Sequence, residues 1–348
     1  MGASLCQTAK VPCGLPEVDL GALARGMPAR EAALEELRSA AHTNGAFYLV
    51  GHGIEEWQFD NMLAAARRLF EISRAELDAI AMLKSPHFRG YTRVGDQLTQ
   101  GRPDLREQLD VGIEHPARGR GADTPDYYLL EGPNQWPEAS PELRPLVLGW
   151  MRRLERVAAR LLSALTESLG LEPNTFATAF SPNPHVNLKI IHYPARDSGP
   201  STQGVGSHKD YGFLTLLLQD EAGGLQILAD GEFVDVPPKR YALLVNLGEM
   251  LEVATNGFLN ATVHRVVSPA SDRDRVSVPY FYNPRLDYTV APLDLPDQFA
   301  REARLVRDPS NPIFAEFGRN ALRGWFRSHP TVAERHHADL VGSFLQQS

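Results

Sequence analysis

A histidine and an aspartate stand one residue apart in the segment GSHKDYGFLTLLLQD, which covers residues 206 to 220. Residues i and i+2 of a strand point to the same face, so His208 and Asp210 are expected to face one space while Lys209 points away. The apolar run that follows is typical of a buried strand. The two side chains are therefore expected at the rim of an interior.

A second histidine, His264, lies further along the chain in the segment NATVHRVVSP. Two histidines and one carboxylate can form a facial triad, which leaves coordination positions open and suits non-haem Fe(II) and oxygen chemistry. Some catalytic zinc sites use the same ligand types, so these types alone leave zinc open. A serine nucleophile at Ser207 is disfavoured because the G-x-S-x-G elbow is absent. We predict His208, Asp210 and His264 as metal ligands.

Three further residues could hold a carboxylate beside this centre. Arg275 and Ser277 alternate on one face of the predicted strand in DRVSVPYFYNP, and Tyr193 lies upstream in KIIHYPARDSG. The planar guanidinium of an arginine matches a carboxylate, and the two hydroxyl groups can add hydrogen bonds. Such a set could hold the far end of a small diacid whose other end chelates the metal. The alternative for Arg275 is a surface salt bridge with Asp272 or Asp274.

Short β-rich segments bounded by Gly, Pro, Asp or Asn dominate the chain after Pro184, and they position all of these residues. Their spacing indicates an antiparallel sandwich or barrel over about residues 184–285. Helical patterns occur before this region, the longest from Pro141 to Leu171, and return at residues 311–345. The predicted fold class is mainly β with flanking helices (α+β).

Composition narrows the class of function. The chain has 348 residues, 43% of them hydrophobic, and a formal net charge of −8. No extended basic run is present, which disfavours nucleic-acid binding, and no segment is long and apolar enough to predict a membrane span. The N-terminus lacks the apolar core of a secretory signal, and Cys6 and Cys13 are the only cysteines. We therefore expect a reducing, cytoplasmic location and no membrane partner.

The combined pattern of H-x-D, a distal histidine and R-x-S resembles the Fe(II)- and 2-oxoglutarate-dependent dioxygenases, and most closely the isopenicillin N synthase group. The resemblance covers nearly the whole chain. Its segments occur in the family order: LPEVDL, NGAFYLVGHGI, FRGY, RPDLREQLDVG, HYP, HKDYGFLTLLLQD, GGLQI, TNG and HRV.

This resemblance implies a distorted double-stranded β-helix, or jelly roll, with helices packed outside it and iron at one end. It implies that His208, Asp210 and His264 bind the iron. The residues that would hold a carboxylate, in most members the far carboxylate of 2-oxoglutarate, are Tyr193, Arg275 and Ser277. The expected organisation is one compact unit with an N-terminal dioxygenase region of helices and edge strands at 13–130, a jelly-roll core at 184–285, and C-terminal loops and a helix that pack on the core at 286–348.

The predicted function is a non-haem Fe(II) enzyme that uses 2-oxoglutarate and O2 to hydroxylate or otherwise oxidise a small molecule, with no obligate protein partner evident. One alternative is 2-oxoglutarate-independent oxidative cyclisation of a peptide-like substrate. Another is a non-catalytic jelly-roll binding protein or a zinc hydrolase. Arg89 stands one position closer to Gly90-Tyr91 than the arginine of the tripeptide cyclase does, which weakens the cyclase alternative. Arg89 and Tyr91 are the candidates for substrate contact.

Overall fold

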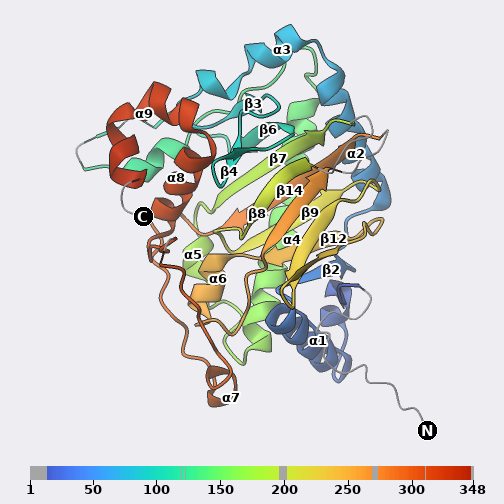
Figure 1. The fold of residues 1–348 in the computed structure, drawn as a ribbon. Helices are drawn as coiled ribbons and strands as arrows, with labels where there is room; N and C mark the ends of the chain where they lie inside the picture. The colour runs from blue at the N-terminus through green and yellow to red at the C-terminus, as the bar shows by residue number, and fades with distance from the viewer. Residues whose placement is uncertain are drawn as a thin grey trace.

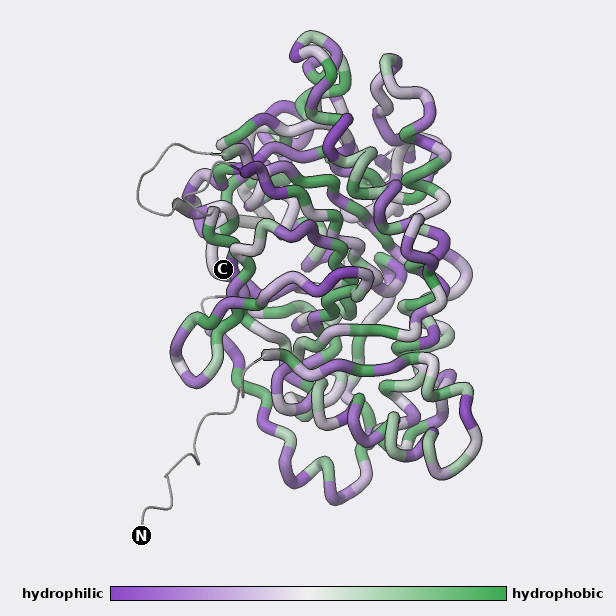
Figure 2. The backbone as a smooth tube through the Cα atoms, turned by 90° about the vertical axis from the view of Figure 1, so that its right-hand side faces the viewer, coloured by the Kyte–Doolittle hydropathy of each residue, from purple (hydrophilic) through white to green (hydrophobic). Residues whose placement is uncertain are grey.

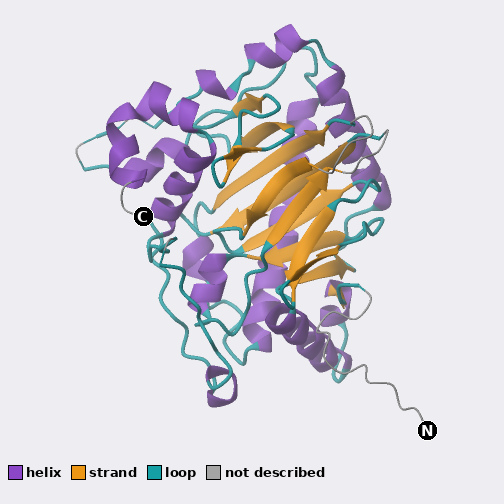
Figure 3. Ribbon diagram, in the orientation of Figure 1, coloured by secondary structure: helices purple, strands orange, loops and turns teal. Residues whose placement is uncertain are grey.

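Two β-sheets form the centre of the molecule, and helices surround them (Figures 1 and 3). The computed structural model describes residues 14–118, 120–121, 123–195, 202–268, 273–309 and 311–345. Both cysteines lie outside these ranges. Within the described ranges, no helix combines the length and the hydropathy that a membrane crossing needs.

The larger sheet has eight strands and provides the floor of the site described below. All neighbouring strands in it run antiparallel except the first two, which are parallel. In order across the sheet, the strands are β1 (Glu17–Asp19), β2 (Ala46–Val50), β12 (Leu243–Leu247), β9 (Leu214–Gln219), β14 (Arg275–Asn283), β7 (His185–Tyr193), β6 (Glu107–Gly112) and β3 (Gly90–Thr92).

The smaller sheet has four antiparallel strands and brings two distant segments together. Its strands, in order, are β11 (Glu232–Asp235), β10 (Leu225–Ala229), β13 (His264–Ser268) and β8 (Thr202–His208). A separate hairpin is formed by β4 (Leu98–Thr99) and β5 (Arg102–Pro103). The register of β8 and β13 places His208 opposite His264, although these residues are far apart in the sequence.

Helices cover one face of the larger sheet and its edges (Figure 1). The longest helix, α4, carries Trp150, Leu154, Ala158 and Leu161 at helical spacing, and all four are buried. It packs with α2 behind the central strands, as the sequence pattern predicts. The helices are α1 (Ala29–Thr43), α2 (Glu56–Glu71), α3 (Arg74–Ala79), α4 (Leu143–Ser168), α5 (Ala177–Phe180), α6 (Glu249–Ala254), α7 (Asp297–Ala300), α8 (Phe317–Ser328) and α9 (Pro330–Leu345).

The central strands show a two-residue alternation that separates the core from the site. In β7, Val186, Leu188 and Ile190 belong to the hydrophobic core beneath α2 and α4. Asn187 and Lys189, which alternate with them, line a cavity on the opposite face. Successive strand residues point to opposite faces, so one strand can serve both environments. Figure 2 shows hydrophobic and hydrophilic stretches interspersed along the backbone.

The structure confirms a mainly β core with helices packed outside, but the sheets stay open and do not close into a barrel. Residues 184–285 supply the four middle strands of the larger sheet, and the N-terminal region adds strands at its two edges. Four strands of the larger sheet come from the N-terminal region, and β2 pairs with β12 while β6 pairs with β7. Those pairings are long-range, and short strands carry little sign of them in the sequence.

Candidate metal centre and its cavity

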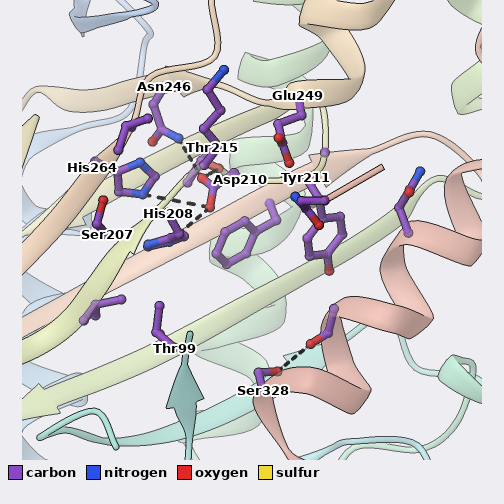
Figure 4. A pocket seen from close by; sticks show the side chains of 18 of the residues that line it. Thr99, Ser207, His208, Asp210, Tyr211, Thr215, Asn246, Glu249, His264 and Ser328 are labelled. Atoms are coloured by element: carbon purple, nitrogen blue, oxygen red, sulfur yellow. Dashed lines mark hydrogen bonds and ion pairs between the residues drawn. The ribbon is translucent and has the colours of Figure 1, made fainter. Parts of the chain in front are cut away.

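Three ligand atoms converge at one end of the smaller sheet. The Nε2 atom of His208 lies 3.6 Å from Oδ1 of Asp210, and Nε2 of His264 lies 3.9 Å from the same oxygen. One ligand atom from each residue can be chosen so that all three lie within 4.8 Å of one another. The three side chains face the same space (Figure 4). Such a donor set fits a 2-His-1-carboxylate metal centre.

The local backbone around Asp210 differs from the expectation of a continuous strand. Strand β8 ends at His208, and Asp210 lies in the connection to β9. The backbone carbonyl of Asp210 accepts a hydrogen bond of 2.8 Å from the amide of Glu249 at the start of α6. A fixed turn therefore aims the carboxylate at the two histidines, where the sequence analysis expected strand alternation.

In each of the two histidines, a hydrogen bond at Nδ1 leaves Nε2 free to face the centre. The Nδ1 atoms of His208 and His264 lie 2.8 and 3.1 Å from the carbonyls of Gly206 and Thr262. An imidazole that donates from Nδ1 to a carbonyl presents Nε2 as its ligand atom. The ring orientation and the tautomer of each histidine are thus set before a metal binds.

The second oxygen of Asp210 is held by two donors. Thr215 Oγ1 donates to Oδ2 at 2.5 Å, and Asn246 Nδ2 donates to the same oxygen at 2.6 Å. Thr215 and Asn246 are opposite each other in the register of β9 and β12. Neither residue was predicted from the sequence. Their only signal was a polar residue inside an apolar run, Thr215 in FLTLLL and Asn246 in LLVNL.

Replacing Thr215 with valine removes one of these donors while keeping the side-chain shape. We expect metal affinity to fall by about 10- to 100-fold, the usual effect of losing a partner that orients a ligand. The measurement is competition of the variant with a chelator for Fe(II) under anaerobic conditions. Thr92→Val is the matched control, since Thr92 is equally buried on β3 and its hydroxyl contacts the sulfur of Met82 at 3.7 Å. Equal affinity of both variants would show that Thr215 does not support the centre.

The electrostatics of the centre favour the ligand forms of these side chains. Burial, with a contribution from His264, lowers the pKa of His208 to about 4, so its imidazole is neutral at neutral pH. Burial opposes ionisation of Asp210, but the two imidazoles and the hydrogen bonds from Thr215 and Asn246 outweigh it and lower the pKa of Asp210. A neutral imidazole and a carboxylate are the forms that bind metal.

A buried arginine opens on the same cavity. Arg275 begins β14 and is 1% exposed. Its Nη1 donates to Ser277 Oγ at 3.2 Å, its Nη2 donates to Gln219 Oε1 at 3.2 Å, and its Nε has no partner among the residues that the structure describes. No carboxylate of a described residue lies within ion-pair distance of it. The alternative prediction was a surface salt bridge between Arg275 and Asp272 or Asp274. Asp274 binds His192 instead, and Asp272 lies outside the described residues.

Tyr193 packs directly against this arginine. The two residues are opposite each other in the register of β7 and β14, and the Arg275 guanidinium lies 4.7 Å from the centre of the Tyr193 ring. A cation over an aromatic face is attracted to it. The three residues Tyr193, Arg275 and Ser277 thus lie together on the cavity wall, as the sequence analysis expected.

On the reverse face of β7, His192 connects three strands next to this wall. Its Nδ1 lies 2.8 Å from Glu107 on β6, and its Nε2 lies 2.9 Å from Asp274, which precedes Arg275. Burial alone would lower the pKa of His192, but hydrogen bonds and charges from the two carboxylates outweigh it and raise the pKa.

This raised pKa predicts a pH-dependent stability. The contribution of His192 is fully present below its ordinary pKa of 6.5 and is lost as pH rises through the higher pKa of the folded state. We expect thermal unfolding of the wild type to shift to lower temperature across that window, relative to His192→Gln. Unfolding temperatures measured for both proteins at several pH values test this. A constant difference between them would exclude a role for His192 titration.

The cavity extends from the centre toward α8 and has a volume of about 1690 Å³. Figure 4 shows Tyr211 pointing into it, with Thr99 and Ser328 on the side away from the metal centre. Residues from both sheets, the β4–β5 hairpin and α8 line it. It is large enough for a diacid and a second small molecule.

Arg89 and Tyr91, predicted to contact substrate, do not line this cavity. Arg89 is buried and donates to the carbonyls of His87 and Leu130. The Tyr91 hydroxyl donates to Glu107 at 2.5 Å, on the face of the sheet away from the cavity. Their segment forms the edge strand β3 and the turn before it, so closeness to a sequence motif did not place them at the site. The prediction that Arg89 and Tyr91 contact the substrate is therefore corrected, because neither lines the cavity.

Comparison with protein families gives two matches that together span most of the chain. A model of the 2OG-Fe(II) oxygenase superfamily matches residues 184–284. A model of the non-haem dioxygenase in morphine synthesis N-terminal region matches residues 15–139. The first match contains His208, Asp210, His264 and Arg275.

Individual relatives cover the chain more completely. The 2-oxoglutarate-dependent dioxygenase frbJ of Dothideomycetidae sp. (strain 11243) is 33% identical over 339 residues, or 92% of this chain and 91% of the relative. Homoarginine-6-hydroxylase 2-ODD-C23 of Glycine max is 34% identical over 274 residues, or 75% of this chain and 80% of the relative.

A solved structure supports the fold. A full-length protein of Neurospora crassa, solved in complex with alpha-KG and thymine, matches with a TM-score of 0.71 at 22% identity, over 95% of this chain and 100% of that chain. At this level of identity the similarity concerns the fold, and it confirms the jelly-roll core.

Proposed function

Because this chain belongs to the 2OG-Fe(II) oxygenase superfamily, we propose that His208, Asp210 and His264 hold its catalytic Fe(II). The protein is a 2-oxoglutarate-dependent dioxygenase, an oxidoreductase that uses Fe(II), 2-oxoglutarate and O2. The observation that carries the proposal is the convergence of two Nε2 atoms and one carboxylate oxygen on one face of a cavity. Two imidazoles and a carboxylate suit Fe(II) and leave positions open for other ligands.

We propose that Arg275, Ser277 and Tyr193 hold the far carboxylate of 2-oxoglutarate. The support is the burial of Arg275 without a carboxylate partner among the described residues, together with the hydroxyl of Ser277 beside it. A buried guanidinium without an anion is costly, and a carboxylate offsets that cost with two parallel hydrogen bonds. The ring of Tyr193 keeps the guanidinium plane in place.

When bound, Fe(II) and 2-oxoglutarate supply the oxidising chemistry, in which O2 is consumed, 2-oxoglutarate becomes succinate and CO2, and a substrate C–H bond is oxidised. The chain itself holds the reactants. Thr215 and Asn246 fix the Asp210 carboxylate, and Arg275 fixes the orientation of the oxoacid. Apolar cavity residues such as Phe281 and Leu217 limit the access of water.

We propose that the primary substrate is a small organic molecule held between the metal centre and α8. The cavity volume supports this, and so do the relatives, since one is named a homoarginine hydroxylase and one solved neighbour contains thymine. The names of the relatives favour a reaction that depends on 2-oxoglutarate over the cyclisation alternative. Membership of the superfamily stands against the binding-protein and zinc-hydrolase alternatives.

The test is formation of succinate from 2-oxoglutarate by purified protein loaded with Fe(II), with and without oxygen. We expect oxygen-dependent succinate, at a low rate without a primary substrate, and its loss when zinc replaces iron. Oxygen consumption that needs no oxoacid would support the cyclisation alternative instead.

A further inference from the structure

A second buried arginine opens on the cavity from helix α8. Arg323 lies on α8, lines the cavity and is 3% exposed. Among the described residues, its buried Nη1 has no hydrogen-bond partner, and its Nη2 donates only to Asn320 Oδ1, at 3.4 Å. The guanidinium also lies 4.8 Å from the centre of the Phe314 ring.

The other buried cations of the cavity wall have carboxylate partners. Lys189 Nζ lies 2.5 Å from Asp110, and Arg106 Nη2 lies 3.3 Å from Asp104. Among the described residues, Arg323 and Arg275 are the buried cations of this wall without a carboxylate at ion-pair distance. Arg275 has a partner in the proposed function, the far carboxylate of 2-oxoglutarate. Among the described residues, Arg323 has no carboxylate partner, and the proposed function does not supply one.

We infer that Arg323 receives a carboxylate of the primary substrate, which is therefore a small organic acid. The inference rests on the proposed function, because it places the substrate in the same cavity as the metal and the oxoacid. A buried guanidinium that lacks an anion destabilises the fold, and a substrate carboxylate offsets this cost when it binds. The planar guanidinium fits a carboxylate with two hydrogen bonds.

The charged groups around Arg323 are mostly positive. Glu249, the first residue of α6, lines the same cavity and interacts electrostatically with Arg323 without reaching ion-pair distance. Arg327 and Arg319 also interact electrostatically with Arg323, so the binding position suits an anion. Burial, with Arg327 nearby, lowers the pKa of Arg323 to about 10, so the guanidinium stays charged at neutral pH.

The body of the substrate is expected to be apolar. Between α8 and the sheet floor, the cavity is lined by Phe281 and Pro279 from β14, by Trp325 from α8 and by Ile313 from the preceding loop. These side chains offer no charge to a ligand. A carboxylate joined to an aliphatic or aromatic body matches the wall.

The experiment compares binding of carboxylates and their neutral amides to protein loaded with Fe(II) and 2-oxoglutarate without oxygen, by calorimetry. The probes are the straight-chain acids from butanoate to decanoate and 4-phenylbutanoate, each with its primary amide. The variant is Arg323→Met. Arg319→Met is the matched control, because Arg319 lies on the same helix and 3.9 Å from the same Phe314 ring but does not line the cavity.

We expect at least one acid to bind wild type and Arg319→Met roughly 10- to 100-fold more tightly than its amide, and Arg323→Met to lose that preference. We also expect Arg323→Met without ligand to unfold at the wild-type temperature or above, because an unpaired buried charge is removed. A lower unfolding temperature would indicate a structural role and overturn the inference.

The inference would also be overturned if wild type bound no acid more tightly than its amide. The affinity of wild type for 2-oxoglutarate is measured first. This measurement distinguishes failure of the proposed function from failure of the substrate inference. If 2-oxoglutarate does not bind, the proposed function fails. If it binds and no acid is preferred, only the substrate inference fails.

Discussion

Asp210→Ala is expected to abolish stoichiometric iron binding and 2-oxoglutarate turnover. Asp210 carries the only negative charge among the three proposed ligands, and its second oxygen is fixed by Thr215 and Asn246. The variant loses a metal ligand. Turnover should therefore fall by more than the roughly 100-fold expected when a residue that only orients a ligand is replaced. Iron content after anaerobic loading and desalting, and succinate formation, are the measurements.

The control for this variant is Asp235→Ala, an exposed aspartate on β11 of the same small sheet. It should keep iron and turnover. Both variants should unfold cooperatively, because neither substitution removes a side chain of the hydrophobic core. An Asp210→Ala protein that is folded and keeps iron would place the metal elsewhere.

Arg275→Gln is expected to raise the KM for 2-oxoglutarate by about 10- to 100-fold, through the loss of hydrogen bonds between charged groups. The guanidinium is 1% exposed and has no carboxylate partner among the described residues, so its charge is available to the oxoacid. Arg275→Lys should restore only part of the affinity, because an ammonium cannot form two parallel bonds to a carboxylate. Initial rates at varied 2-oxoglutarate concentration give the KM.

Arg265→Gln serves as the control, because Arg265 lies on β13 and binds Gln226 away from the oxoacid position. Its KM should match the wild type. An unchanged KM in Arg275→Gln would assign the oxoacid to another cation, and Arg323 would be the first to examine.

The sequence predicted the residues of the metal centre because their chemistry and order form one recognisable pattern. His208, Asp210 and His264 are ligand types at a spacing that a short-stranded β core can bring together, and the structure does so by pairing β8 with β13. Arg275 and Ser277 could be predicted as a pair because strand alternation puts them on one face.

The rest depends on long-range packing that one sequence does not reveal. Thr215 and Asn246 meet Asp210 only because β9 and β12 pair in one register. Arg323 reaches the cavity because α8 packs beside β4, far in the sequence from any motif (Figure 1). Arg89 was predicted at the site from its place beside Gly90 and Tyr91, but the turn before β3 directs it to backbone carbonyls.

The most direct measurement is an anaerobic crystal structure of the protein with Fe(II) and 2-oxoglutarate. We predict one iron bonded to Nε2 of His208, Oδ1 of Asp210 and Nε2 of His264, with the oxoacid chelating it and its far carboxylate on Arg275. Iron at another position, or the far carboxylate seated away from Arg275, would contradict this account.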